Sequence, residues 1–320
     1  MNKQNKILTT ALVIQVLVLA VVFWPSSSAF SGERLFGELS ADQIVRLTIH
    51  DADGNRIVLA QDAGKWVLPE AGDFPVQEDL VAPLLDKIVD IRGDRLVTQT
   101  SGSHERLKVA AQAFERLIEF ELADGGGHKL YLGTAPNYQV LHVRADDEDA
   151  VYLALGLTVY EARAESVAWI DPVYFSVHTD QIVALTLENP NGRFEFTKDE
   201  AGAWTMKGLA DDETLIQNNV KSLVNRFGSM RMQRPLGQDA QASYGLENPS
   251  ATVTLEAQQD GETKTYILRV GASLEGEGEG GYVVRSATSS YYVLMADYTV
   301  DDLLEKTRQD LIAPPPTPEP

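Results

Sequence analysis

The sequence predicts an α+β protein in which an N-terminal transmembrane helix precedes two tandem, mutually similar domains. Each domain is expected to be a mostly antiparallel sheet with one or two packed helices. Three observations predict this class: an uncharged apolar run near the N-terminus, a long internal repeat, and hairpin-like strands with few helical stretches. The length of 320 residues suits about two domains of roughly 150 residues each.

Composition and charge exclude several classes of function. The formal net charge of -20 argues against nucleic acid as a partner, because phosphate binding needs clustered Lys and Arg. The chain contains no cysteine, which excludes disulfides, zinc sites with cysteine ligands, thiol catalysis and a lipid anchor on cysteine. With 44% hydrophobic residues, the composition is that of a folded chain.

The first element is an apolar segment from Ile7 to Trp24 (residues 7–24) that contains no charged residue. As a helix it would be about 27 Å long, close to the thickness of the hydrocarbon layer of a bilayer. Lys3 and Lys6 precede it, so the positive-inside rule predicts a cytoplasmic tail over residues 1–6 and the bulk of the chain on the other side of the membrane. We therefore expect a single-pass membrane protein.

A cleaved signal peptide is the alternative for the same segment, with Ser27-Ser28-Ala29 as a small-residue cleavage site. The apolar run is longer than the core of about 7–15 residues that signal peptides have, which favours an uncleaved anchor. Residues 25–40, which are rich in Ser, Gly and charged side chains, then form a linker.

An internal repeat divides the rest of the chain. The segment QIVRLTI at 43–49 recurs as QIVALTL at 181–187, a shift of 138 residues. The repeat predicts a first domain over 41–178 and a second over 179–312. A Pro-rich tail over 313–320 follows and is expected to be extended.

Both copies predict the same order of elements: a tight β-hairpin, a strand with a tryptophan, an amphipathic helix, four strands and a short closing helix. The helices are expected at about 77–91 and 158–165 in the first copy, and at about 212–227 and 299–308 in the second. The four strands are expected near 117–122, 128–132, 140–144 and 150–154, and near 251–257, 263–270, 281–286 and 290–295.

Three loops carry formal ligand motifs, and each is better explained as a turn. Gly276 to Gly281 satisfies GxGxxG, but glutamates lie inside it and a strand follows, whereas a dinucleotide site needs a helix there. Asp51 to Asn55 resembles the start of a calcium loop, but Asp62 stands where the bidentate glutamate belongs. Asp146 to Asp149 is an acidic loop tip, for which a solvated surface is expected.

No catalytic signature is visible. The chain has no GxSxG, SxxK or GxxxxGK[ST] motif, and its histidines lack HExxH spacing. Carboxylate pairs of the glycosidase kind stay open, because 47 acidic residues form many pairs and a sequence gives no distances. We therefore predict no catalytic, cofactor-binding or metal-binding residues and no cofactor. The histidines, each expected at the surface or in a sheet, are His50, His104, His128, His142 and His178.

Three kinds of residue recur in both copies: Trp66 with Trp204, Gly133 with Gly271, and Arg144 with Arg285. The tryptophans and glycines suit packing and turns. The arginines are the best polar candidates for a site, although an arginine on a strand more often covers apolar surface with its stem.

The motif Tyr244-Gly245-Leu246, followed by Pro249, predicts a helix C-cap in which Gly245 is left-handed. With the GxW turns, Tyr-Val-Val-Arg at 282–285 and Tyr-Val-Leu at 292–294, it makes the chain similar to the bacterial domain-of-unknown-function family 4340. The second copy carries these motifs best, since the first has Arg106-Leu107-Lys108-Val109 in place of the Tyr-Gly-Leu turn.

The resemblance implies an extracytoplasmic accessory component of a gliding-type ABC transporter, with permease and ATPase subunits as partners. It implies no catalytic residues. We therefore expect a non-enzymatic adaptor or binding component anchored in the bacterial inner membrane by one helix, with the bulk of the chain in the periplasm. Two alternatives stay open: a cell-envelope hydrolase that acts on glycans through paired carboxylates, and a passive envelope scaffold.

The anchor predicts the N-terminus of the native protein. Because the segment is expected to stay in the membrane, mass spectrometry of the protein purified from its own membranes should find the residues before Ile7. A mature chain that begins at Phe30 would instead identify the segment as a cleaved signal peptide.

Overall fold

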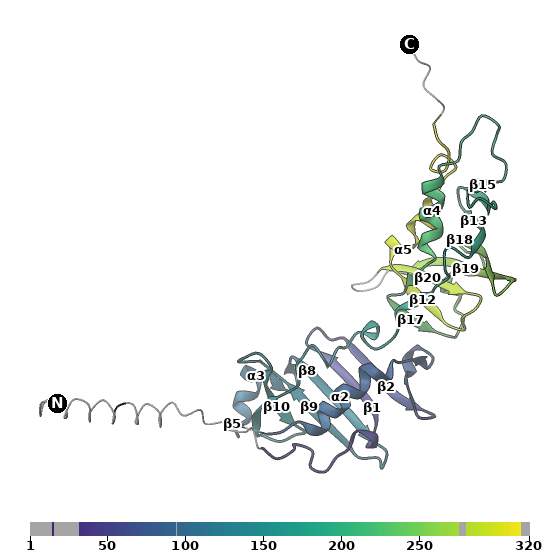
Figure 1. Ribbon diagram of the computed structural model, residues 1–320. Coiled ribbons are helices and arrows are strands. Elements are labelled where there is room, and N and C mark those ends of the chain that lie inside the picture. The colour runs from purple at the N-terminus through teal and green to yellow at the C-terminus, as the bar shows by residue number, and fades with distance from the viewer. Residues whose placement is uncertain (1–14, 16–31, 94, 275–279, 315–320) are drawn as a thin grey trace, which may run out of the picture.

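The computed structural model describes residue 15 and residues 32–93, 95–274 and 280–314 (Figure 1). Apart from Gln15, the membrane helix predicted over 7–24 lies outside these residues, as do positions 315–320 of the predicted tail. Within the described residues, no helix has the length and apolar character needed to span a bilayer.

Two large antiparallel sheets and a few helices make up the described chain, as the predicted sheet-rich α+β class requires. The first sheet has nine strands in the order β4-β3-β2-β1-β8-β9-β10-β11-β5. Its strands are β1 (Ile44–Asp51), β2 (Arg56–Asp62), β3 (Lys65–Leu68), β4 (Phe74–Pro75), β5 (Arg95–Thr98), β8 (Arg116–Leu122), β9 (Gly127–Leu132), β10 (Val140–Ala145) and β11 (Val151–Leu155).

The second sheet has eight strands in the order β15-β14-β13-β18-β19-β20-β21-β17. Its strands are β13 (Ile182–Asn189), β14 (Gly192–Lys198), β15 (Trp204–Met206), β17 (Arg234–Gly237), β18 (Ala251–Gln259), β19 (Glu262–Leu274), β20 (Gly281–Ser286) and β21 (Tyr292–Met295). Two small strand pairs complete the described sheets: β6 (Val109–Ala110) with β7 (Ala113–Phe114), and β12 (Val173–Phe175) with β16 (Met230–Arg231).

Apart from the extra edge strand β4, the two sheets share one strand order, with β1 in the place of β13 and β8 in the place of β18. Finer details also correspond. The first six residues of β1 and β13 have the same pattern of buried and partly exposed residues. The pairing of β1 with β8 shifts register after Ile44, and that of β13 with β18 shifts after Ile182. The correspondence found in the sequence therefore holds in three dimensions.

Helices cover one face of each sheet, which we call the inner face (Figure 1). The longer ones are α2 (Glu78–Asp90), α4 (Gln217–Arg226) and α5 (Asp297–Glu305), and a short helix α3 (His104–Leu107) lies in the first half. Helix α2 buries residues at helical spacing, among them Val81, Leu84, Leu85 and Ile88, against the first sheet. Five 3-10 turns complete the described helices: η1 (Ala41–Gln43), η2 (Pro69–Ala71), η3 (Ser101–Ser103), η4 (Ser166–Ala168) and η5 (Ala242–Tyr244).

The second long helix begins at Gln217, several residues after the predicted start near 212. The residues before it pair with the C-terminal segment instead. Leu215 forms a β-bridge with Ile312, and the Ile216 N–H donates to the Leu311 carbonyl at 2.8 Å. A backbone held extended by this pairing has no free groups for a helical turn.

The prediction of a helix over 158–165 is wrong, because the chain makes turns and bends there. The Glu161 carboxylate accepts hydrogen bonds from the Thr158 N–H at 2.9 Å and from its hydroxyl at 3.1 Å, a pairing typical of a helix start, but the chain does not continue as a helix. A distant side chain bonds a carbonyl that such a helix would use. Arg116 Nε donates to the Ala162 carbonyl at 2.9 Å. The matching closing helix of the second copy is present as α5.

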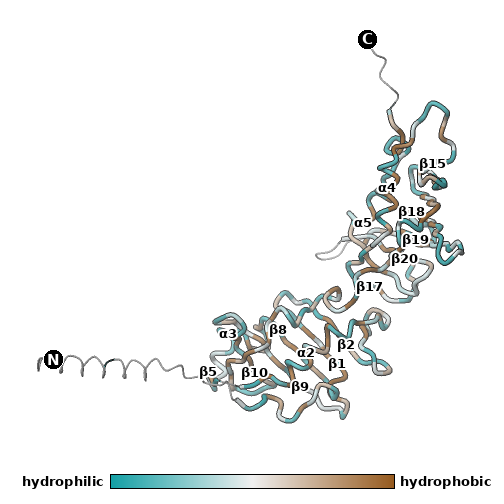
Figure 2. Tube along the Cα trace, viewed as in Figure 1, coloured by the Kyte–Doolittle hydropathy of each residue, from teal (hydrophilic) through white to brown (hydrophobic). Residues whose placement is uncertain are grey.

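The strands bury alternate residues on the inner face and present the others on the opposite, outer face. Figure 2 colours the chain by hydropathy and shows apolar and polar residues interspersed along it. On the outer face of each sheet a smaller apolar cluster forms. In the first sheet it contains Leu107, Leu117 and Tyr131, and in the second it contains Tyr244 and Tyr292.

A left-handed turn lies on the outer face of each sheet. In the second sheet η5 ends at Gly245, which has φ 67°, so the predicted C-cap is confirmed. In the first sheet Lys108 takes the same place, with φ 58°. Each turn brings a carbonyl against a glycine, Gly271 within β19 and Gly133 directly after β9. A Cβ on Gly271 would lie 2.0 Å from the Tyr244 oxygen, and one on Gly133 would lie 2.1 Å from the Leu107 oxygen.

The two sheets meet through a few contacts at the turn between β3 and β4. Gln238 Nε2 donates to the Gly72 carbonyl at 2.8 Å, and the Tyr291 hydroxyl donates to the Asp73 carbonyl at 3.0 Å. The Phe74 and Tyr291 rings pack edge to face with centroids 4.7 Å apart. Strand β12, which precedes residue 179, pairs with β16 and so joins the second half.

The close approach at Gly271 makes a testable prediction. Gly271→Ala should lower the free energy of unfolding by about 2–3 kcal/mol, because the new Cβ forces the Tyr244 carbonyl away from the sheet. Chemical denaturation followed by circular dichroism measures this change.

Gly127→Ala is the matched control, since Gly127 also lies in a strand and its Cβ would be 3.4 Å from the nearest atom. It should change stability by less than about 0.5 kcal/mol. Equal effects of the two substitutions would show that the turn does not depend on this contact.

Candidate functional site

Four polar side chains form a row across the outer face of the second sheet. Thr252 on β18 is the direct partner of Arg269 on β19, and Arg269 is the direct partner of Arg285 on β20. Arg285 Nη1 donates to the Tyr292 hydroxyl at 2.5 Å, and its guanidinium lies 4.5 Å from the centre of that ring. We call these four residues the arginine row.

A pocket of about 870 Å³ opens over the arginine row and is called the arginine pocket. Polar groups of the row lie on the strands, and apolar side chains from the turn after β17 stand beside them. Its lining residues besides the row are Ala240, Gln241, Ala242, Tyr244, Leu246, Glu247, Pro249, Ile267, Ser286 and Ala287. The volume lies in the range of about 300–1,000 Å³ that small-molecule sites have.

The two positive charges of the row have no neutralising partner in the part of the chain that the structure describes. Neither guanidinium there has a carboxylate oxygen within 4.0 Å, although Glu247 lines the same pocket. Directly opposite residues on antiparallel strands have Cβ atoms about 4.5–5.5 Å apart, and like charges in that position are destabilising. The arginine row is therefore an electropositive spot on an acidic protein.

The same place in the first sheet is closed. Its row consists of Leu117, Tyr131, Arg144 and Val151, of which three are apolar or aromatic. Arg144 is only 4% exposed and lies 3.9 Å from the centre of the Tyr131 ring.

Main-chain oxygens surround the buried Arg144. Its Nε donates to the Val109 carbonyl at 2.7 Å, and its Nη1 donates to the Asp146 carbonyl at 2.7 Å and the Glu148 carbonyl at 3.4 Å. The β6–β7 hairpin lies over the row, with the Phe114 ring 6.3 Å from that of Tyr131. Arg144 is thus a structural residue.

Tyr244, at the edge of the arginine pocket, is a neutral group. Burial raises the pKa of its hydroxyl, and although Arg234 lowers the pKa, Tyr292 and Asp239 raise it again. The hydroxyl donates to the Leu236 carbonyl at 3.4 Å. Its proton is therefore retained, and the side chain serves as a wall of the pocket.

The loop from Asp51 to Asn55 is a turn, as predicted, and it is stabilised by its own residues. The Asp51 carboxylate accepts bonds from the N–H groups of Asp53 (3.0 Å) and Asn55 (2.8 Å) and from the Asn55 side chain (2.8 Å). Burial raises the pKa of Asp51, but these hydrogen bonds outweigh it and the pKa lies below its ordinary value. The carboxylate is fully used by its own loop.

The acidic tip at 146–149 has a structural role that the sequence did not indicate. Its main-chain carbonyls form hydrogen bonds with the side chains of Arg144 and His104. His104 Nε2 lies 3.0 Å from the Asp149 carbonyl oxygen. Of the GxGxxG segment, positions 275–279 lie outside the described residues, and the strand expected after it is present as β20.

The histidines lie in separate places. His50 Nε2 is 3.3 Å from a Glu119 carboxylate oxygen, and His128 Nδ1 is 2.9 Å from one of Asp146. Within the described ranges, no three His, Asp or Glu side chains come together in a way that could hold a metal ion. The other histidines are His104 on α3, His142 on β10 and His178 in a turn.

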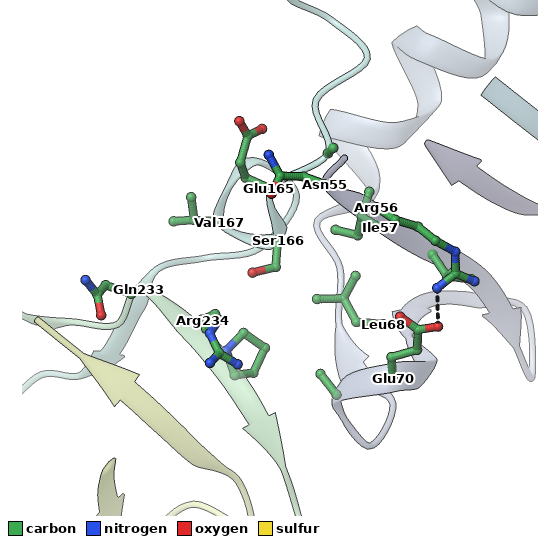
Figure 3. A pocket seen from close by; sticks show the side chains of 14 residues that line it. Asn55, Arg56, Ile57, Leu68, Glu70, Glu165, Ser166, Val167, Gln233 and Arg234 are labelled. Carbon is green, nitrogen blue, oxygen red and sulfur yellow. Dashed lines mark hydrogen bonds and ion pairs between the residues drawn. The ribbon is translucent and has the colours of Figure 1, made fainter. Parts of the chain in front are cut away.

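A second pocket of about 640 Å³ lies where the two sheets meet (Figure 3). Figure 3 shows Arg56 bonded to Glu70, at 2.6 Å, with Gln233 and Arg234 on the opposite wall. Because both sheets line it, its shape depends on their few mutual contacts. The arginine pocket is built on one sheet, and for that reason it is the better candidate for a functional site.

Sequence reasoning found Arg285 and missed Arg269, Thr252 and Tyr292. Arg285 was visible because the repeat preserves it, whereas the other members of the row differ between the copies. A position-by-position comparison of the copies, which places Tyr131 against Arg269, is the signal that indicates them.

Removing each arginine should separate the two roles. Arg144→Ala should lower the free energy of unfolding by about 2–4 kcal/mol, because it deletes buried bonds from a charged donor and leaves three carbonyls unpaired. Arg285→Ala should cost less than about 1 kcal/mol, because it also relieves the repulsion with Arg269. Urea denaturation of both variants measures the difference, and equal losses would contradict it.

Comparison with known families gives one match. A family model described as Domain of unknown function (DUF4340) matches residues 66–241 and 215–316, which together span most of the chain. Comparisons with curated proteins and with solved structures gave no match. The chain belongs to the DUF4340 family, as its Tyr-Gly-Leu and Gly-x-Trp turns predicted.

Proposed function

We propose that this protein is a non-enzymatic binding component of a gliding-type ABC transporter, anchored in the bacterial inner membrane by residues 7–24. Two tandem domains of one ancestry stand in the periplasm, and the second carries the ligand site. The observation that carries the proposal is the contrast between the two equivalent rows: the row of the first sheet is covered by side chains of its own half, and the arginine row of the second lies under an open pocket.

The shared construction of the two sheets supports a duplication. Both have one strand order, one register shift after the first strand residue, and one left-handed turn over a glycine at the equivalent position. Independent sheets would not repeat such local irregularities, since bulges and left-handed turns are set by individual residues.

The closed face supports a structural role for the first copy. Arg144 there has its hydrogen bonds inside the protein, and the β6–β7 hairpin covers the row. The open face supports binding by the second copy, because a pocket of ligand size with a few convergent polar groups is what small-molecule sites share.

The order along the chain fits an anchored adaptor. Figure 1 shows the two sheets end to end, with the N-terminal side of the described chain at the first sheet. Arg34 forms a β-bridge with Arg92 just before β5, so the chain enters the first sheet at that edge. A membrane anchor before residue 25 would therefore hold the first copy near the bilayer and the second copy farther out. The transporter partner follows from what the family resemblance implies.

Co-purification tests the proposal. The full chain, extracted in mild detergent from its own membranes, should bring down a permease and an ATPase subunit, and chemical crosslinking should link them to the domains outside the membrane. A tagged chain whose residues 7–24 are replaced by an unrelated transmembrane helix is the control. Association should survive this exchange, because the adaptor surfaces lie in the sheets. If neither chain brings down a transporter subunit, the proposal fails.

A further inference from the structure

We infer that the arginine pocket binds a small ligand through an oxyanion, a phosphate or carboxylate group, seated between Arg269 and Arg285. The inference rests on the proposed function, in which the second copy is the binding unit. The inference is based on two arginines that lie directly opposite each other and line an open pocket. Neither has a carboxylate partner among the described residues.

In the part of the chain that the structure describes, the arginine row lacks the acidic partners that are common elsewhere. The sequence holds 47 acidic against 27 basic residues, so carboxylates are abundant as partners for arginine. Elsewhere in the described chain several arginines have them: Arg56 pairs with Glu70 and Arg34 with Asp90. The two arginines of the row repel each other across one strand spacing, and an anion between them turns that repulsion into attraction.

The arginine row presents hydrogen-bond donors that suit an oxyanion. A guanidinium presents several N–H groups in a fixed fork that matches the oxygens of a phosphate or carboxylate. The Tyr292 hydroxyl accepts a bond from Arg285, which orients that guanidinium and leaves the hydroxyl proton free to donate. The Thr252 hydroxyl stands at the other end of the row, beside Arg269. The row thus offers two forks flanked by two hydroxyls.

The walls indicate the rest of the ligand. Leu246, Pro249 and Ile267 line the pocket together with the Tyr244 and Tyr292 side chains. These surfaces suit the body of a molecule that carries the anion, such as a sugar ring or a short acyl chain. An extended polyanion does not fit, because the chain as a whole has a net charge of -20 and would repel it.

The first sheet provides an internal comparison. Tyr131 stands in the place of Arg269, and Leu117 in the place of Thr252. The single arginine of that row is buried and donates through Nε and Nη1 to three carbonyls. Of the two rows, the one in the second sheet therefore presents its guanidinium groups to an open pocket.

Thermal unfolding of the full chain in detergent tests the inference with sodium phosphate, sodium acetate and glycerol 3-phosphate, each against sodium chloride at equal ionic strength and pH. Phosphate or acetate in excess of its dissociation constant should raise the midpoint by about 2–4 °C, since a ligand that binds the folded state stabilises it. A larger shift with phosphate than with acetate identifies a phosphoryl ligand, and the reverse identifies a carboxylate. A further rise with glycerol 3-phosphate shows that the walls contact the body of the ligand.

Substitutions assign the shift to the row. Arg269→Ala and Arg285→Ala should each weaken anion binding at least about tenfold, and Arg285→Lys should weaken it too, because it keeps the charge but loses the fork. The paired change Thr252→Leu with Arg269→Tyr copies the first sheet and should abolish the shift. Lys221→Ala, which removes an exposed charge from α4 on the inner side, is the matched control and should leave the shift unchanged.

The inference is overturned if no anion stabilises the chain more than chloride, or if the shift persists in both arginine variants. Folding of the variants is checked by their midpoints in chloride. This outcome is separate from the transporter experiment: loss of the anion shift leaves co-purification intact, and loss of co-purification leaves the anion shift intact.

Discussion

The contact on which both outer faces depend is the approach of a turn carbonyl to a glycine in or directly after a strand. At Gly271 and at Gly133 the missing side chain lets the preceding turn lie flat on the sheet. That placement decides what covers the strands next to it. Over the second sheet the turn continues to Leu246 and Pro249 and leaves a hollow above the arginine row. Over the first it continues into the β6–β7 hairpin, which fills the equivalent space.

One scaffold thus accommodates an arginine in two physical ways. In the first sheet the guanidinium of Arg144 is withdrawn from water, and main-chain oxygens together with an aromatic ring replace its hydration. In the second sheet Arg285 keeps access to solvent and stands beside a second arginine. The first arrangement stabilises the fold, whereas the second leaves interaction capacity for another molecule. The arginine is the same in both sheets, and its neighbouring residues decide which of the two arrangements it adopts.

Local patterns explain which parts of the fold could be predicted. Helix α2 follows from the spacing of Val81, Leu84, Leu85 and Ile88, and the hairpins follow from alternation and Asp-Gly or Asn-Gly turns. The errors lie where distant residues decide. The later start of α4 results from pairing of Leu215 with Ile312, and the missing helix at 158–165 results in part from the bond that Arg116 makes to Ala162. Such contacts leave no periodic trace in the chain.

Only part of the candidate site could be predicted from the sequence. A search for repeats finds residues that are identical in both copies, and so it found Arg285. The other residues of the arginine row differ between the copies and were missed. The register that places Arg269 against Arg285 is a property of strand pairing, which the sequence alone does not give.

Lys108 makes the covered face of the first copy more costly to form than the open face of the second. A lysine at φ 58° is less stable than glycine by about 1 kcal/mol, and Gly245 holds the same conformation without that strain. The strained turn leads into the β6–β7 hairpin, whose packing on Leu117, Tyr131 and Val151 offsets the strain. Part of the stability that the first copy gains by covering its row is therefore lost in the backbone of the turn that precedes the cover.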